Sequence, residues 1–245
     1  MHEIPRTVVF RLPTVLGMDL SITNEVLLLW LAAGVTFVLL ALACRRRGPV
    51  ARGWFQNLFE ALIQFIEKEV IRDTVGKQGR EWAPFLLALF FFLLIANLLG
   101  MVPLPDVFQA ATANLSVTAG LALMVFAITM VVAIRANGFI GFLRSFVPGG
   151  VPRAVAVLIV PIEVVSWLAK PASLAVRLFA NMVAGHALLL VFVSLEVVAA
   201  WFLLPLPLAG AVVMSLFEIF VCFIQAFVFT LLTAIYISEA ASTVH

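Results

Sequence analysis

The sequence has 245 residues and is short of charge: 11% of them are Asp, Glu, Lys or Arg, and the net charge is +2. A soluble globular domain carries roughly 25% charged residues, so this composition cannot supply a conventional water-facing surface. Hydrophobic residues make up 64% of the chain, and the mean hydropathy is +1.18. The composition excludes a disordered chain and a basic nucleic-acid-binding domain, and it predicts that most of the surface faces lipid.

Cysteine is equally scarce, and the motifs of several common active sites are missing. Cys44 and Cys222 lie 178 residues apart inside apolar runs, so we interpret them as small buried hydrophobic residues and not as a disulfide framework. The sequence has no Gly-x-x-x-x-Gly-Lys-Ser/Thr loop, no His-Glu-x-x-His and no Cys-x-x-Cys. We therefore expect no bound nucleotide, no metal and no other cofactor.

Three long runs without charge predict membrane-spanning helices over residues 26–44, 82–102 and 115–134. The first run has 19 residues, enough to cross a hydrocarbon core of about 30 Å at ~1.5 Å per residue. Acidic residues precede it and three arginines follow at 45–47, which is not the charge order of a signal peptide. Basic segments stay in the cytoplasm, so we expect residues 1–25 outside and the C-terminus in the cytoplasm.

The last third of the chain is apolar for far longer than one span. Two segments, 154–203 and 211–238, are separated by a short stretch that contains two prolines. Both exceed the roughly 20 residues of an upright span. We expect a hairpin of two long, steeply tilted membrane helices, the first of them bent at Pro161 and Pro171.

Residues 50–72 have a different pattern, in which apolar residues recur at helical spacing with charged and amide residues opposite them. This pattern predicts an amphipathic helix on the cytoplasmic surface. The chain as a whole, 1–245, is thus expected to form one all-α integral membrane domain. Its parts are three roughly upright spans, this surface helix and the tilted hairpin.

Six ionisable side chains, besides one tyrosine, interrupt the apolar hairpin. A charge near the bilayer centre costs at least ~2.5–3.5 kcal/mol, so each needs a purpose or a partner. The first three are seven residues apart and share one stripe, because that spacing drifts by only about 20° per step on a straight helix. Ser173 and Asn181 extend this stripe by one turn on either side of Arg177. The six residues are Glu163, Lys170, Arg177, His186, Glu196 and Glu218.

The second hairpin helix has a stripe of its own. Glu218, Gln225 and Tyr236 lie within about 20° of one another at ~100° per residue. Stripes of this kind are typical of a water-lined passage or of a polar contact with another protein, and they do not suit lipid. We expect Lys170 to pair with Glu163 or to extend towards the membrane surface.

The register of the hairpin can be predicted from the residue types. A turn centred near residues 201–202 places Arg177 level with Gln225 and His186 level with Glu218. A turn centred on the two prolines would instead bring two acids face to face. We prefer the first register, because it pairs an arginine with an amide and a histidine with an acid.

The run from Lys170 to His186, Lys-Pro-Ala-Ser-Leu-Ala-Val-Arg-Leu-Phe-Ala-Asn-Met-Val-Ala-Gly-His, closely resembles the signature of subunit a of F-type ATP synthases. The run from Gln225 to Ser238, Gln-Ala-Phe-Val-Phe-Thr-Leu-Leu-Thr-Ala-Ile-Tyr-Ile-Ser, resembles that family's last helix. The resemblance covers essentially the whole chain. It implies a subunit that is no enzyme on its own, borders the rotating c-ring, works with the peripheral-stalk subunit b and lies in a bacterial inner membrane.

The resemblance also implies roles for single residues. Arg177 is then the stator arginine that faces the ring, with Asn181 and Gln225 beside it. His186 and Glu218 line an outer half-channel. In familiar bacterial members an acid holds the position of His186 and a histidine that of Glu218, so the two are exchanged here.

In the implied mechanism, protons enter past Glu196, His186 and Glu218 to a ring carboxylate. They leave near Glu163 after nearly a full revolution, while Arg177 blocks a direct leak because its guanidinium does not deprotonate. The transported ion is the proton, with sodium left open. We count three more polar residues among those that line the path: Ser173, Asn114 and Tyr236.

Each of these residues also has a simpler, structural interpretation. Arg177 would then only pack helices, His186 would hold a helix contact by a hydrogen bond, and Glu196 would reach the outer headgroups. Asn114 would be a polar helix start. For the whole chain, the alternatives are a self-contained ion-coupled secondary transporter and a structural subunit without conduction.

Overall fold

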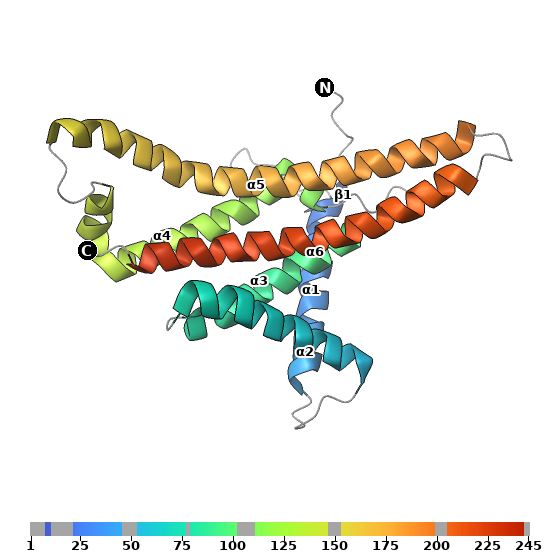
Figure 1. Ribbon diagram of the computed structural model, residues 1–245, viewed down its shortest axis with the longest axis horizontal. Coiled ribbons are helices and arrows are strands. Elements are labelled where there is room, and N and C mark those ends of the chain that lie inside the picture. The colour runs from blue at the N-terminus through green and yellow to red at the C-terminus, as the bar shows by residue number, and fades with distance from the viewer. Residues whose placement is uncertain are drawn as a thin grey trace.

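The computed structural model describes residues 8–10, 22–45, 53–76, 79–101, 111–146, 153–198 and 205–242 (Figure 1). Five helices in these ranges are long and apolar enough to cross a membrane, which confirms the predicted all-α membrane fold. They are α1 (Asn24–Arg45), α3 (Gly79–Gly100), α4 (Leu115–Ser145), α5 (Arg153–Val198) and α6 (Pro205–Ser242).

Two short elements were not expected. The strand β1 (Val8–Phe10) pairs antiparallel with β2 (Ile22–Thr23) directly before α1, and the 3-10 turn η3 (Ala111–Ala113) precedes α4. Most of the predicted outer segment 1–25 and two of the three arginines at 45–47 lie outside the described residues.

Helix boundaries differ from the sequence expectation at two places. The helix α4 runs on to Ser145, well beyond residue 134, and Gly138 with φ of 70° changes its direction; glycine adopts this angle without a Cβ clash. The helix α6 already begins at Pro205, so the break expected over 203–210 was placed too late. Proline is tolerated there, because the first N–H groups of a helix have no intrahelical acceptor.

The two hairpin helices lie side by side and antiparallel (Figure 1). The helix α5 is continuous over 46 residues with Pro161 and Pro171 inside it, and it appears as one curved helix without a break. Each proline removes one backbone donor, and here this loss accompanies gradual curvature. Figure 1 also shows both helices running across the direction of α1, as a steeply tilted hairpin does.

The amphipathic segment forms the helix α2 (Trp54–Ile66), which continues as the π-helix η1 (Glu67–Val75). Its apolar face packs against α3 and α6. Ile66 is fully buried, and the Phe65 ring lies 5.3 Å from the Phe227 ring of α6. The segment therefore supports α6 from the side opposite α5 (Figure 1).

The helix α6 is packed along its second half and exposed along its first. Phe229 and Ile237 are fully buried among α3, α4 and α5, whereas Leu206 and Val213 are 75% and 66% exposed. Thr233 is also fully buried, and its hydroxyl donates to the Phe229 carbonyl at 2.8 Å. Small buried residues let the helices approach closely, so this half fixes the side chains that follow below.

Candidate functional site

The hairpin brings His186 of α5 and Glu218 of α6 together. The His186 Nδ1 atom lies 3.6 Å from Oε1 of Glu218, whose side chain is buried. The ring also contacts two backbone carbonyls, because Nδ1 lies 2.9 Å from the Met182 oxygen and Nε2 lies 3.0 Å from the Gly100 oxygen of α3. A neutral imidazole donates to only one of them, and the doubly protonated ring donates to both. The contacts of this ring therefore change with its protonation.

Gly185 makes room for the Glu218 carboxylate. A Cβ atom at Gly185 would lie 2.6 Å from Oε1 of Glu218, so the carboxylate keeps its present position only because residue 185 has no side chain. Nearer the turn, a Cβ at Gly210 would lie 2.5 Å from the Phe192 ring. These contacts fix the antiparallel register of α5 and α6, and the predicted His186–Glu218 couple is confirmed.

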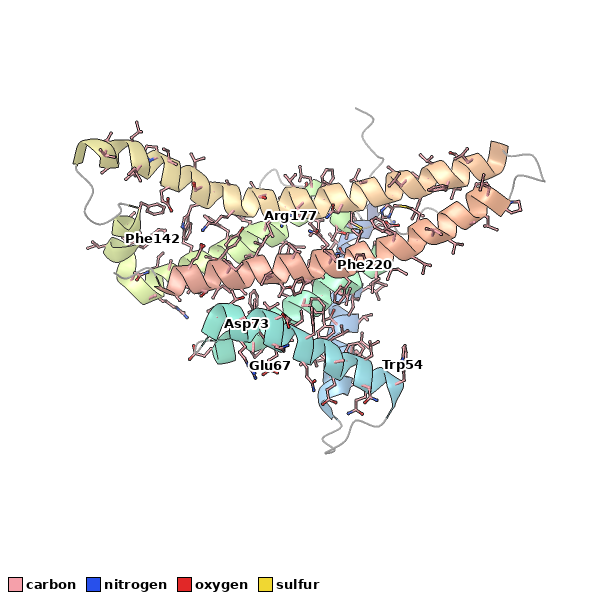
Figure 2. All side chains as sticks on the ribbon, viewed as in Figure 1. Trp54, Glu67, Asp73, Phe142, Arg177 and Phe220 are labelled. Carbon is pink, nitrogen blue, oxygen red and sulfur yellow. The ribbon has the colours of Figure 1, made fainter. Side chains whose placement is uncertain are left out.

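The second predicted couple, Arg177 with Gln225, is wrong by one helical turn. Asn181 takes the place of Arg177, and its Nδ2 atom donates to Oε1 of Gln225 at 2.7 Å. The His186–Glu218 couple places residue 179 level with Gln225, two residues from Arg177 and two from Asn181, and the structure pairs Gln225 with Asn181. Arg177 is exposed near the middle of α5 (Figure 2), and it makes no hydrogen bond or ion pair within the described part of the chain.

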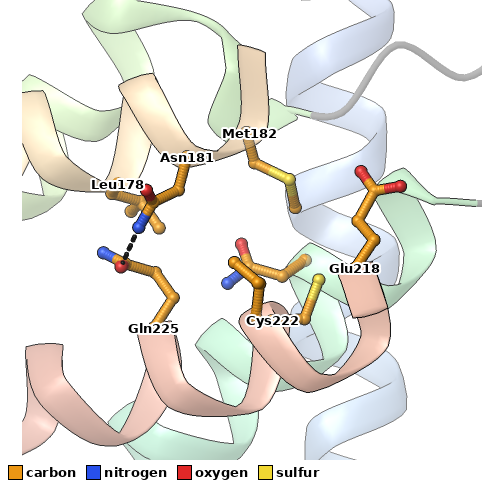
Figure 3. Close-up of a pocket in the computed structure, with 8 residues that line it drawn as sticks. Leu178, Asn181, Met182, Glu218, Cys222 and Gln225 are labelled. Carbon is orange, nitrogen blue, oxygen red and sulfur yellow. Dashed lines mark hydrogen bonds between the residues drawn. The ribbon is translucent and has the colours of Figure 1, made fainter. Parts of the chain in front are cut away.

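A small pocket lies between the two couples (Figure 3). Three of its lining residues carry five buried polar atoms without a hydrogen-bond partner: both amide atoms of Asn97, both carboxylate oxygens of Glu218 and Nε2 of Gln225. Buried polar groups are nearly always hydrogen-bonded, so the unpaired atoms on these three side chains set this region apart from the apolar packing around it. The lining residues are Asn97, Leu178, Asn181, Met182, Glu218, Val221, Cys222 and Gln225.

Sequence reasoning missed Asn97, which is 1% exposed on α3. The only signal was an amide in the middle of an apolar span. A single amide of this kind has no spacing or partner in the sequence that would assign it to a site. Its importance comes from α3 lying against α6, and this contact was not predicted.

The other end of the hairpin holds a separate charged contact. Lys170 pairs with Glu239 of α6, and its ammonium lies 5.2 Å from the centre of the Tyr236 ring. The expected pairing of Lys170 with Glu163 is therefore wrong, because the end of α6 lies beside Lys170. Glu163 and Ser173 are both exposed on α5, away from the pocket.

Two further candidates are placed differently from the pocket residues. The Asn114 oxygen accepts from the Ser116 N–H at 2.8 Å, and its amide donates to Glu25 of α1 at 2.8 Å. These bonds make Asn114 a polar helix start. Glu196 belongs to the last turn of α5, but its side chain lies outside the described residues.

Comparison with known proteins adds independent information. The model of the ATP synthase A chain family matches residues 26–238. ATP synthase subunit a of Magnetococcus marinus is 42% identical over 228 residues, which is 91% of this chain and 86% of that protein. The subunit a of Mesorhizobium japonicum is 41% identical over 235 residues, covering 94% of this chain and 91% of that protein. The chain therefore belongs to the ATP synthase A chain family, as a multi-pass membrane subunit that is no enzyme on its own.

Proposed function

We propose that this subunit is the stator that conducts protons to and from the carboxylates of a rotating c-ring through two offset half-channels. The observation that carries the proposal is the position of Arg177, an exposed cation halfway along an apolar helix. A charge in the membrane is stable only where an opposite charge or a polar passage compensates it. A carboxylate of a neighbouring ring supplies that compensation.

The surface around Arg177 suits a large helical partner. Leu188 and Leu195 lie within about 20° of Arg177 around α5 at ~100° per residue, and they are 46% and 50% exposed. A ring of apolar helices covers such a face, and each of its carboxylates stays neutral until it reaches Arg177. The peripheral-stalk subunit b belongs to the same proposed assembly.

The outer half-channel leads past Glu196 to the His186–Glu218 couple. An imidazole can both accept and donate a proton, and the His186 ring lies beside an acid that can receive one. Tyr236, at the far end of the second stripe, and Asn114 complete the residues proposed for the path. Protons leave on the cytoplasmic side near Glu163 and Ser173.

Arg177 separates the two half-channels. A guanidinium keeps its proton at accessible pH and presents five donors, so it attracts a ring carboxylate without relaying protons itself. We place the protein in a bacterial inner membrane, with the N-terminus outside and the C-terminus in the cytoplasm. The arginines at 45–47 support this orientation.

The test is Arg177→Ala, assayed by ATP-driven acidification of inverted membrane vesicles. We expect pumping to be lost while the purified complex keeps its full set of subunits. Arg135→Ala is the matched control, because Arg135 is an exposed arginine of the neighbouring helix α4. Normal pumping by Arg177→Ala contradicts the proposal, as does transport by this subunit reconstituted alone, which is the behaviour of a self-contained transporter.

A further inference from the structure

Three sulfur-bearing side chains meet between α5, α6 and the end of α3. The Cys222 thiol of α6 donates to the Met101 sulfur at 3.5 Å, and Met101 directly follows α3. Met182 of α5 and Cys222 form a small buried cluster of their own, with Met101 packed against it. Figure 3 shows the side chains of Met182 and Cys222 extending towards each other from their two helices. One thiol and two thioethers are therefore gathered in one place.

The spacing of these sulfur atoms suits a shared metal ion. Thiolate and thioether sulfurs are soft ligands, and they select soft ions such as Cu(I). Taking ~2.3 Å, the length of a zinc–thiolate bond, as the metal–sulfur distance, two sulfurs on one ion at ~100–120° lie about 3.5–4.0 Å apart. The 3.5 Å between the Cys222 and Met101 sulfurs lies within this range. The two side chains are thus already spaced as ligands of one ion.

The composition of the cluster selects a soft monovalent ion over other metals. The described part of the chain has no group of three or more His, Cys, Asp or Glu side chains that could hold a metal ion, and zinc and calcium sites are built from such groups. Charge leads to the same choice, because Cys222 is only 2% exposed. A thiolate and a monovalent ion form a neutral pair, whereas a divalent ion would leave a net charge that is costly to bury.

We propose that Cys222, Met101 and Met182 bind a soft monovalent metal ion, Cu(I) in the cell, and that the bound ion blocks proton transport. The blockade rests on the proposed proton-conducting function. On binding, the Cys222 thiol loses its proton to water and its sulfur bonds to the ion, while the oxidation state of the copper stays the same. Cys222 and Met182 line the same pocket as Glu218. The ion therefore lies beside a carboxyl group that is proposed to pass protons on.

The position of the ligands explains why the sequence led us to expect no metal. Metal motifs are recognised from closely spaced Cys and His residues, whereas these three ligands are far apart in the sequence and two of them are methionines. Only the packing of α5, α6 and the end of α3 brings them together. Met101 is partly buried and not fully enclosed, so an ion can reach the thiol from its side.

The first test measures metal binding directly and does not depend on transport. The purified whole complex is dialysed against Ag(I) buffered with excess free cysteine, so that a lone thiol competes poorly for the ion. Ag(I) is the probe, because it is soft like Cu(I) and keeps one oxidation state in the assay. We expect the unaltered complex to bind one equivalent more than Cys222→Ser, as counted by mass spectrometry of the metal.

The two methionines distinguish the proposed site from a lone cysteine. Met101→Leu and Met182→Leu keep an apolar side chain of similar volume, and each should weaken silver binding at least tenfold. Met124→Leu is the matched control, because Met124 is 42% exposed on α4 and lies outside the cluster. Equal binding by all three leucine variants overturns the metal site, and so does equal binding by Cys222→Ser and the unaltered complex.

The second test asks whether the bound ion blocks transport. Inverted vesicles are prepared and assayed in buffered Ag(I), and ATP-driven pumping is recorded. We expect half-inhibition of Cys222→Ser and Met101→Leu at a silver concentration at least tenfold higher than for Met124→Leu. Silver that acts on other subunits affects all variants alike, so the comparison isolates this site. Met101→Leu keeps the test decisive if Cys222→Ser fails to assemble.

Pumping by the silver-loaded unaltered complex at the rate of the silver-free complex contradicts the blockade. Failure of the proposed function has a different signature. In that case Arg177→Ala pumps normally without silver, while silver binding is still lost in Cys222→Ser.

Discussion

One added methyl group at Gly185 should disable transport without dismantling the complex. In Gly185→Ala the new Cβ would lie 2.6 Å from Oε1 and 3.0 Å from Cδ of Glu218. Ordinary van der Waals contact begins near 3.4 Å, so the carboxylate must retreat by about 0.8 Å. The carboxylate is the far end of a flexible side chain, so its retreat costs little stability, and alanine returns about 1 kcal/mol of helix propensity. The net loss is small enough for assembly to persist.

The effect on transport should be larger than the effect on stability. A misplacement of about 1 Å in a reacting group can cost roughly a hundredfold in rate. We expect ATP-driven pumping in inverted vesicles to fall at least tenfold in Gly185→Ala. Gly120→Ala on α4 is the control, because a Cβ there meets nothing within 4 Å. The double variant Gly185→Ala with Glu218→Asp shortens the carboxylate and should pump faster than Gly185→Ala alone.

Two results would refute this reasoning. The first is pumping by Gly185→Ala at the rate of Gly120→Ala, which would mean that the position of the Glu218 carboxylate does not limit transport. The second is an equal loss in both alanine variants, which would show a general effect of stiffening the helices and not a local clash.

Two further predictions concern the hairpin. The Lys170–Glu239 pair is partly exposed, and such pairs contribute about 0–1 kcal/mol. Lys170→Glu should therefore lower the melting temperature of the complex by only a few degrees, and adding Glu239→Lys should restore it. No recovery in the double variant would mean that the pair does not form. In a background without native cysteines, cysteines at positions 186 and 218 should be joined by a short bifunctional thiol reagent, and absence of the crosslink would contradict the register.

The register of the hairpin was predictable because it depends on few quantities. Two antiparallel helices have the same rise per residue, so their register depends only on which residue lies at the centre of the turn. Pairing His186 with Glu218, a histidine with an acid, determines that residue. The prediction failed by one turn at Arg177, because this register leaves Arg177 and Asn181 equally far from the level of Gln225. In the structure Asn181 makes the hydrogen bond to Gln225.

Contacts between more distant elements were not predictable from these patterns. Asn97 takes part in the pocket only because α3 packs against α6, and nothing in an apolar run specifies which neighbour it meets. Lys170 pairs with Glu239, 69 residues away in the sequence, because α6 continues beyond residue 238, where its end was predicted. Local spacing indicated Glu163, which is close in sequence but exposed in the structure.

The uneven packing of α6 divides the hairpin into a fixed part and a compliant part. Phe229 and Ile237 hold the second half of α6 among its neighbours, while Leu206 and Val213 leave the first half open. Glu218 and its pocket lie near the boundary between these halves. The polar side chains of the pocket are thus held by the packed half of α6, whereas the exposed half has few contacts that would keep it from shifting. In the proposed function, the exposed half could follow a ring that turns past it while the spacing inside the pocket stays constant.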